Sequence, residues 1–200
     1  SELSDSLSYI YSDLPYFLLK FYLEKKYQSS LDNQIKNYLY DKIGSTSLTY
    51  KPINFFNDKL IVPTAIDNYF RFDIVQGHVH DMGAAMMDGI SGHAGLFGNS
   101  LDIAKILQLF LQKGSYANEK FFDEKFFDLF NFRHFKEKKV RRGMGFDKPE
   151  LDPNDPNTCG CASDKSVGHY GFTGSVAWVD PETEIIYVFL SNRTFPDENN

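Results

Sequence analysis

The 200 residues of this chain, 42% of them hydrophobic, are enough for a sizeable core and have an ordinary globular composition. A net charge of −6 argues against a nucleic-acid partner. We recognise no signal peptide, no internal repeat and no apolar run long enough to cross a bilayer, so we expect no transmembrane segment in this chain.

The first third of the chain carries two helix signals. Apolar residues recur at helical spacing over residues 14–27, and Asp13 is well placed as the N-cap of that helix. A second apolar stripe predicts a helix over residues 31–43, which Gly44 would end. Residues 45–69 contain two prolines and are predicted to be an irregular surface excursion.

Three further elements are expected in the middle of the chain. Ser100 can cap a helix with one apolar face that ends at Gly114, and residues 121–132 repeat aromatic side chains at roughly helical spacing. Residues 136–142 form a basic run, which is more often a solvated face than a binding site. Residues 142–147 are a candidate for a short strand.

A strand hairpin is predicted near the end of the chain. Residues 175–179 are rich in β-branched and aromatic side chains, residues 180–183 have turn chemistry, and residues 185–190 are an unbroken apolar run. The second run lacks a polar face, so we expect it to be a central strand that is covered on both sides. Glycines bracket His169 just before the hairpin, which is typical of a site where a ligand approaches the backbone.

The two cysteines, Cys159 and Cys161, lie in a Pro/Asp/Asn-rich loop over residues 149–166. Metal sites usually need a second cysteine pair, and cysteines this close in sequence bridge poorly. We therefore expect neither a metal site nor a disulfide here.

Three groups of residues could support chemistry, although each has a structural explanation when it is taken alone. A tyrosine before a helix is usually a packing residue, Asp13 can act simply as a cap, and histidines often hydrogen-bond loop carbonyls. The groups are Tyr11-Ser12-Asp13, then His78, His80, Asp81 and His93, and finally His169-Tyr170-Gly171.

Together these segments resemble the serine β-lactamase and penicillin-binding protein superfamily, in its class C β-lactamase, esterase and DD-peptidase-like branch. Tyr11-Ser12-Asp13 resembles the Tyr-x-Asn motif, and residues 168–174 (GHYGFTG) resemble the Lys/His-Thr-Gly strand motif. Similar family segments are found at residues 77–81 (GHVHD), 92–97 (GHAGLF) and 190–196 (LSNRTFP).

The resemblance implies an α+β fold in which helices flank an antiparallel sheet beside a helical lobe. Residues 1–200 would be the C-terminal portion of one such domain, with the helical lobe roughly over residues 1–140 and the sheet portion roughly over residues 141–200. The family's nucleophile belongs to a Ser-x-x-Lys motif, but no serine or threonine here has a lysine three positions later. We therefore expect a missing N-terminal portion of the same protein, without which the chain is inactive.

The resemblance also implies residue roles. Tyr11 and His169 would be catalytic, and Asp13, Gly171, Phe172, Thr173 and Asn192 would bind substrate. Tyrosine has a pKa near about 10, so as a base it needs nearby positive charge, which the missing lysine, and His169 if protonated, would supply. The N–H of Phe172 would form half of an oxyanion hole. Asp13 and Tyr170 stand where asparagine and threonine are usual in the family.

The implied function is a serine hydrolase that cleaves amide or ester bonds through an acyl-enzyme, without a cofactor or a metal. Its substrate would be a small molecule or derived from peptidoglycan, and its setting would be the periplasm or cell envelope. The resemblance also implies that the chain could come from a protein fused to a β-N-acetylglucosaminidase-type glycoside hydrolase. Two alternatives stay open: a non-catalytic module that binds cell-wall fragments, and a metal site at His78, His80, Asp81 and His93.

Overall fold

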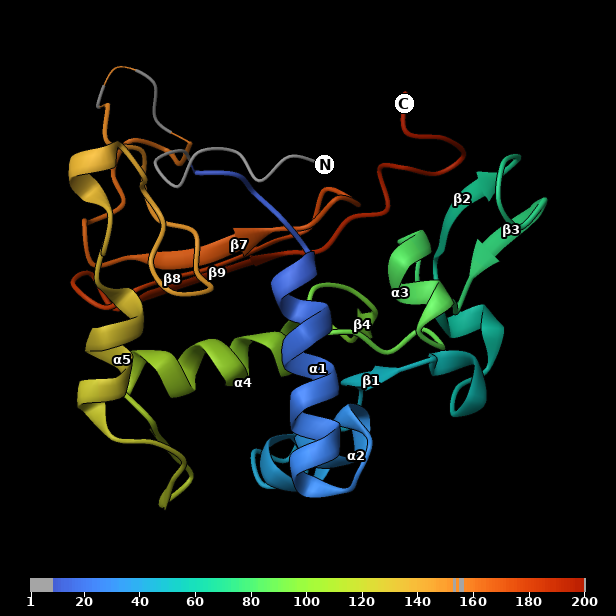
Figure 1. Ribbon diagram of the computed structural model, residues 1–200, viewed down its shortest axis with the longest axis horizontal. Coiled ribbons are helices and arrows are strands. Elements are labelled where there is room, and N and C mark those ends of the chain that lie inside the picture. The colour runs from blue at the N-terminus through green and yellow to red at the C-terminus, as the bar shows by residue number, and fades with distance from the viewer. Residues whose placement is uncertain (1–8, 153, 155–156, 200) are drawn as a thin grey trace. The chain divides into compact units, whose positions relative to one another are not determined.

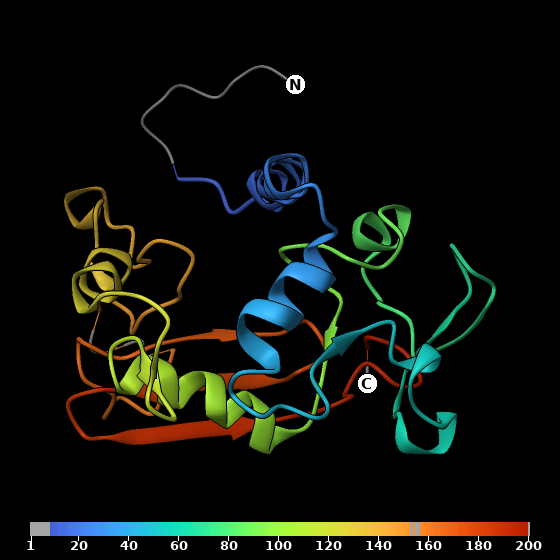
Figure 2. The same ribbon diagram turned by 90° about the horizontal axis from the view of Figure 1, so that it is seen from below.

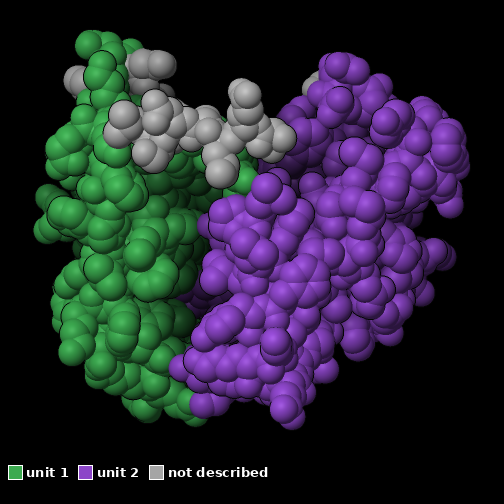
Figure 3. Space-filling model, viewed as in Figure 1, with its two compact units in different colours: residues 1–12, 107–169, 178–187 green, residues 13–106, 170–177, 188–200 purple. Residues whose placement is uncertain are grey.

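The computed structural model describes residues 9–152, 154 and 157–199. The chain forms two compact units (Figure 3). Unit 1 comprises residues 1–12, 107–169 and 178–187, and unit 2 comprises residues 13–106, 170–177 and 188–200. Each unit therefore mixes segments from both sides of the predicted division near residue 140, and four of the elements, one helix and three strands, contribute residues to both units.

Unit 2 begins with helix α1 (Leu14–Tyr27), whose predicted bounds are confirmed. The next predicted helix is present only in part, because α2 (Leu31–Ile35) continues as a π-helical turn (Lys36–Tyr40) rather than as an α-helix. In this turn the backbone N–H groups bond five residues back, as in the 3.0 Å bond from Asp41 N to Lys36 O. The widened turn buries Tyr40, and Gly44 follows with the positive φ of +65° that ends the segment.

Asp13 occupies the predicted N-cap position of helix α1, but its side chain makes no capping bond. Its backbone is in the right-handed helical region, whereas a capping residue is usually extended, and its carboxylate accepts no bond from the first turn. Pro15, which lacks an N–H, also removes one of the donors that a cap would satisfy. The carboxylate of Asp13 is therefore available for other contacts.

Residues 45–69 are more regular than predicted. Strand β1 (Thr49–Tyr50) pairs antiparallel with β4 (Leu96–Phe97), and β2 (Pro63–Asp67) pairs antiparallel with β3 (Asp73–Gln76). The β2–β3 hairpin is visible in Figure 1. Asp67 closes its turn by accepting the backbone N–H groups of residues 69–71. These bonds stabilise the turn of the hairpin. The sequence prediction of an irregular segment relied on the two prolines and did not include these bonds.

Two helices complete unit 2. The short helix α3 (Met82–Met86) is capped by Asp81, which accepts the N–H of Ala84 at 2.6 Å. The longer helix α4 (Ser100–Leu111) continues into unit 1. The predicted cap, Ser100, is already inside the helix. The preceding residue, Asn99, caps it instead, since its Oδ1 accepts the N–H of Asp102 at 2.9 Å.

Buried Asp102 fastens the start of α4 to the loop over residues 45–47. Its Oδ2 accepts bonds from the backbone N–H groups of Thr46 and Ser47, at 3.0 and 2.8 Å, and from the hydroxyls of Ser45 and Ser47, at 3.0 and 2.6 Å. Lys105 Nζ lies 2.7 Å from the other carboxylate oxygen. One carboxylate therefore satisfies the donors of an entire turn.

Unit 1 is organised around aromatic side chains. The ring of Phe110, near the end of α4, is in contact with three other aromatic rings. Its centroid lies 6.1 Å from that of Phe122, 6.2 Å from that of Phe127 and 5.1 Å from that of Phe146. Phe127 belongs to helix α5 (Glu124–Asn131), which is shorter than the predicted helix over residues 121–132. The strands β5 (Ser115–Tyr116) and β6 (Glu119–Lys120) form the hairpin between α4 and α5. These contacts are spaced as aromatic pairs prefer.

Three strands run side by side through both units, β7 (Val167–Tyr170), β8 (Val176–Asp180) and β9 (Ile185–Phe189) (Figures 1 and 2). Their order among the described residues is β7-β8-β9, so within this chain β8 is the central strand, and not residues 185–190 as predicted. Among the described residues β9 is an edge, and its alternate side chains are 52–59% exposed. With helices and antiparallel sheets together, the fold is α+β, as predicted.

The cysteine prediction is also wrong, because Cys159 and Cys161 form a disulfide. Their Cα atoms are 5.3 Å apart, which is within the ordinary range for a bridge. Gly160 between them has a φ of +75°, a conformation that favours glycine and that folds the chain back on itself. A tight turn at glycine thus overcomes the short separation in sequence.

Candidate active site

Tyr11 and His169 of unit 1 share one partner, the guanidinium of Arg142. Arg142 Cζ lies 4.8 Å from the centroid of the Tyr11 ring, and Nη1 lies 3.0 Å from His169 Nε2. The Arg142 side chain is 19% exposed, whereas Tyr11 is 58% exposed. We call these three residues the tyrosine–arginine–histidine cluster. It brings the two predicted catalytic side chains to the same positive charge.

Asp147 holds this cluster in position. An isolated antiparallel bridge joins Asp147 to Gly168, with N–O distances of 2.8 and 3.1 Å, and Gly168 is the residue before His169. The buried Asp147 carboxylate forms a two-bond pair with Arg141, at 2.7 and 2.9 Å, and lies 3.5 Å from Arg142 Nη2. Beyond this bridge, residues 142–147 do not form the predicted strand. The backbone bridge and the ion pairs together set where Arg142 meets His169.

In unit 2, Asp13 lies in a second group with Asp81 and His93. One ligand atom from each residue falls within 4.8 Å of the others. Both ring nitrogens of His93 are hydrogen-bonded: Nε2 lies 3.0 Å from Asp81 Oδ1, and Nδ1 lies 2.9 Å from Ser91 Oγ. The ring also packs edge-on against Phe17, with ring centroids 4.8 Å apart. The carboxylate that does not cap α1 therefore faces a carboxylate–imidazole pair.

The pKa of Asp81 is lower than usual in this group. Partial burial by itself would raise that pKa, but the N–H of Ala84 and the ring of His93 outweigh the effect of burial and stabilise the charged form. Asp81 is therefore an anion that caps a helix and holds an imidazole at the same time.

The predicted alternative of a metal site at four residues is only partly assembled. Asp81 and His93 lie together, but His78 is exposed, and His80 stacks on Phe172 with ring centroids 5.2 Å apart. Asp13, which the prediction did not include, replaces them beside Asp81 and His93. Two carboxylates and one imidazole are chemically able to bind a divalent cation. However, His93 and Asp81 already bond to each other.

The glycine-flanked turn after β7 places three predicted substrate-binding residues in unit 2. Gly171 N donates to Ser175 O at 2.7 Å, and Thr173 O accepts the N–H of Arg193 at 3.1 Å. Arg193 also donates to Phe172 O at 3.1 Å and covers the Phe172 ring at 5.8 Å. Among the described residues, no acceptor is found for the N–H of Phe172, the group that would form half of the oxyanion hole.

Asn192, the remaining predicted binding residue, fastens the segment after β9 to strand β2. Its Nδ2 donates to Pro63 O at 3.0 Å, and buried Thr194 donates from its hydroxyl to Thr64 O at 2.8 Å. Within unit 2 these two bonds fix the segment over residues 190–196. The amide N–H of Asn192 thus has a structural partner.

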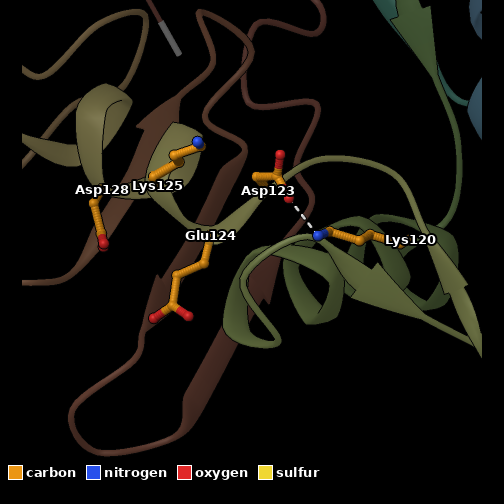
Figure 4. A pocket seen from close by; sticks show the side chains of 5 residues that line it. All are labelled: Lys120, Asp123, Glu124, Lys125 and Asp128. Atoms are coloured by element: carbon orange, nitrogen blue, oxygen red, sulfur yellow. Dashed lines mark hydrogen bonds and ion pairs between the residues drawn. The ribbon is translucent and has the colours of Figure 1, made fainter.

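A shallow hollow in unit 1 does not coincide with any predicted site residue. It is lined by side chains from β6, from α5 and from the N-cap residue of α5, and in Figure 4 they point in different directions around it. Lys120 pairs with Asp123, and Lys113 pairs with Glu124 at the same surface. The lining residues are Lys120, Asp123, Glu124, Lys125 and Asp128. Paired, mostly exposed charges of this kind are typical of a solvated surface.

Sequence reasoning missed Arg142 and Asp147. The sequence assigned them to a solvated basic run or to a short strand. Their link to His169 was not visible, because 27 residues separate Arg142 from His169 along the chain. The only local signal was a pair of arginines, Arg141 and Arg142, followed by a glycine-flanked methionine and then by Asp147. Nothing in that spacing indicates pairing with a strand far along the chain.

A beta-lactamase family model matches residues 6–200. The chain is 33% identical over 213 residues to the N-acetylmuramyl-L-alanine amidase of Bacillus subtilis (strain 168), which covers 96% of this chain and 47% of that protein. It is 30% identical over 197 residues to an Escherichia coli (strain K12) protein named as a candidate D-alanyl-D-alanine carboxypeptidase, with coverage of 92% and 45%. The chain thus spans about half the length of these relatives.

Solved structures support the same fold. A beta-lactamase from Mycobacterium bovis aligns with a TM-score of 0.62 at 14% identity, covering 94% of this chain and 57% of that one. The simvastatin synthase of Aspergillus terreus aligns with a TM-score of 0.57 at 14% identity, covering 84% and 46%. These structural alignments establish a beta-lactamase-like fold. At an identity of 14% they carry no information on the substrate.

Proposed function

Because this chain belongs to the beta-lactamase family, we propose that it is the C-terminal portion of a serine hydrolase that cleaves amide or ester bonds. The observation that carries the proposal is the contact of one guanidinium with both Tyr11 and His169, since these residues come from the two motifs that would form the active site. The nucleophile would come from a Ser-x-x-Lys motif in the N-terminal portion of the full-length protein.

The proposed reaction proceeds through an acyl-enzyme. The serine attacks the carbonyl carbon while Tyr11 accepts its proton, the leaving group departs with a proton, and water then hydrolyses the ester. The N–H of Phe172, for which no acceptor is found among the described residues, would stabilise the oxyanion. Gly171 beside it would leave room for the substrate. Thr173 and Asn192 would contact polar groups of the substrate.

The substrate class that we propose is peptidoglycan or a fragment of it. Support comes from the relatives, which are named for an N-acetylmuramyl-L-alanine amidase and a D-alanyl-D-alanine carboxypeptidase. A periplasmic or cell-envelope setting would agree with the Cys159–Cys161 disulfide, since disulfides persist in oxidising compartments. Within the described part of the chain, every helix is too short or too polar to span a membrane. Membership of the class C branch and fusion to a β-N-acetylglucosaminidase-type hydrolase stay predictions.

Covalent labelling tests the proposed function. The full-length protein, which joins this chain to its N-terminal portion, is incubated with a fluorescent penicillin and, separately, with a fluorophosphonate, and the adduct is located by mass spectrometry. We expect one labelled serine, upstream of Tyr11 and within Ser-x-x-Lys. A protein that takes up neither probe but retains muropeptides would contradict catalysis and favour the alternative of a non-catalytic binding module.

The charge of Asp13 gives a prediction about substrate choice. Its carboxylate makes no cap bond and lies near the anionic Asp81, so it should repel a substrate carboxylate that a neutral asparagine would tolerate. We expect Asp13→Asn to raise kcat/KM for a carboxylate-bearing substrate about 10-fold relative to its neutral amide analogue, as one nearby charge predicts. The matched control is Asp73→Asn, which removes an exposed charge from β3. Equal changes for both substrates would show that Asp13 does not select by charge.

A further inference from the structure

The tyrosine–arginine–histidine cluster contains a side chain to which sequence patterns assign no role, Arg142. Of the five N–H groups on its guanidinium, one points at His169 Nε2 at 3.0 Å, and the face of the guanidinium approaches the Tyr11 ring at 4.8 Å. Its side chain is 19% exposed, so most of it is removed from solvent.

The contact with Arg142 assigns a role to Nε2 of His169. A guanidinium can only donate, and it stays protonated throughout the physiological range. Nε2 of His169 is therefore the acceptor in this contact, which is the arrangement that an Nδ1–H tautomer would make. The charge beside the tyrosine belongs to Arg142.

Asp147 makes the placement of Arg142 specific. The Asp147 carboxylate is buried, its Oδ2 lies 3.5 Å from Arg142 Nη2, and both of its oxygens accept bonds from Arg141. The backbone bridge from Asp147 to Gly168 connects this anchor directly to the strand that carries His169. A planar guanidinium can meet an imidazole, a carboxylate and an aromatic face at the same time, whereas a lysine ammonium cannot.

We propose that Arg142 is a positioning residue of the active site, which holds His169 as the neutral Nδ1–H tautomer and presents a fixed positive charge to the face of Tyr11. This inference deepens the proposed function and rests on it. The charge would favour the phenolate form that Tyr11 needs to accept a proton from the serine, because an opposite charge nearby stabilises an ionised group. A neutral imidazole would also add no second positive charge beside the guanidinium of Arg142, so the two side chains would not repel each other.

Kinetics of the full-length protein test the role. We expect Arg142→Met to lower the acylation kcat about 100-fold, the scale of one lost electrostatic contact, while KM changes less than about threefold. Arg142→Lys keeps the charge and a donor but not the planar fork, so it should recover about a tenth of the wild-type rate. Lysine and methionine variants that are equally impaired would overturn the charge-based role.

The neighbouring arginine is a matched control for stability. Arg141 bonds to the same carboxylate more closely than Arg142 does, and it also pairs with Glu150 at 2.7 Å. We therefore expect Arg141→Met to lower the Tm at least as much as Arg142→Met, while kcat stays within about threefold of wild type. If Arg141→Met reduces kcat as much as Arg142→Met does, Arg142 acts only through the packing around Asp147 and the proposal fails.

A readout that needs no turnover separates this inference from the proposed function. In ¹⁵N-histidine NMR spectra of the full-length protein at pH 7.5, His169 should show an unprotonated Nε2 and a protonated Nδ1. Arg142→Met should abolish that single tautomer. A protonated Nε2 in the wild type would overturn the proposal about Arg142 even if penicillin labels the serine. If labelling fails and the tautomer is found, the arginine–histidine contact stands and only the catalytic assignment is lost.

Discussion

Replacing Tyr11 by phenylalanine in the full-length protein is expected to lower the acylation kcat about 10³-fold, within the range for loss of a general base. The ring would stay above Arg142 because phenylalanine keeps the aromatic face that lies 4.8 Å from the guanidinium. Only the phenolic oxygen is lost, so KM and folding should change little. Stopped-flow acylation by a chromogenic cephalosporin or a thioester substrate measures the effect.

The control for Tyr11 is its neighbour Tyr9. This tyrosine is 53% exposed in the same segment of unit 1, and no motif includes it. Tyr9→Phe should leave acylation within about twofold of wild type, the scale expected of a surface change. Should Tyr11→Phe behave like Tyr9→Phe, the tyrosine would be a packing residue and another base would have to be found.

The second large effect is expected on stability, at Asp102. Asp102→Ala would remove a buried carboxylate and leave the donors of residues 45–47 without their acceptor. The free energy of unfolding should fall by about 3 kcal/mol, the scale for breaking a buried network with a charged acceptor. Urea denaturation followed by circular dichroism measures the change. The exposed Asp73→Ala serves as the control and should cost about 0.5 kcal/mol or less.

The effect of Asp102 should depend on pH. Burial alone would raise the pKa of Asp102, but Lys105, Ser47 and the backbone N–H groups outweigh burial and hold the pKa well below its usual range. A carboxyl with a depressed folded-state pKa contributes its stability above the unfolded pKa of about 3.9 and loses it as pH falls toward the folded value. The difference between wild type and Asp102→Ala should therefore shrink between about pH 5 and pH 2. A difference that stays constant would rule out the charge as its source.

The elements that the sequence predicted well depend on local signals. Helix α1 has its predicted bounds, and β8 and β9 flank the predicted turn, because apolar spacing and turn residues act over a few positions. The contacts of Arg142 with His169 and of Asp102 with Ser47 join residues far apart in sequence. Spacing along the chain contains no information on such pairs, so they required the structure.

Three predictions failed because a general rule was applied where another feature of the structure overrides it. The rule against close disulfides failed at Cys159 because a left-handed glycine reverses the chain there. At Asp13, which is the N-cap residue, the side-chain capping bond is missing because the backbone is helical rather than extended. The third rule, that an apolar run is a central strand, failed because strand order is a property of the sheet and not of one segment.

Strand β9 has a practical consequence for anyone who prepares these 200 residues alone. Its sequence, residues 185–189 (IIYVF), contains no charge and no proline, and among the described residues no strand pairs with its outer edge. Natural edges usually carry a lysine, a proline or a bulge that discourages intermolecular pairing. The isolated chain should therefore self-associate as its concentration rises, and a lysine at exposed Tyr187 would be the first substitution to try for keeping it monodisperse.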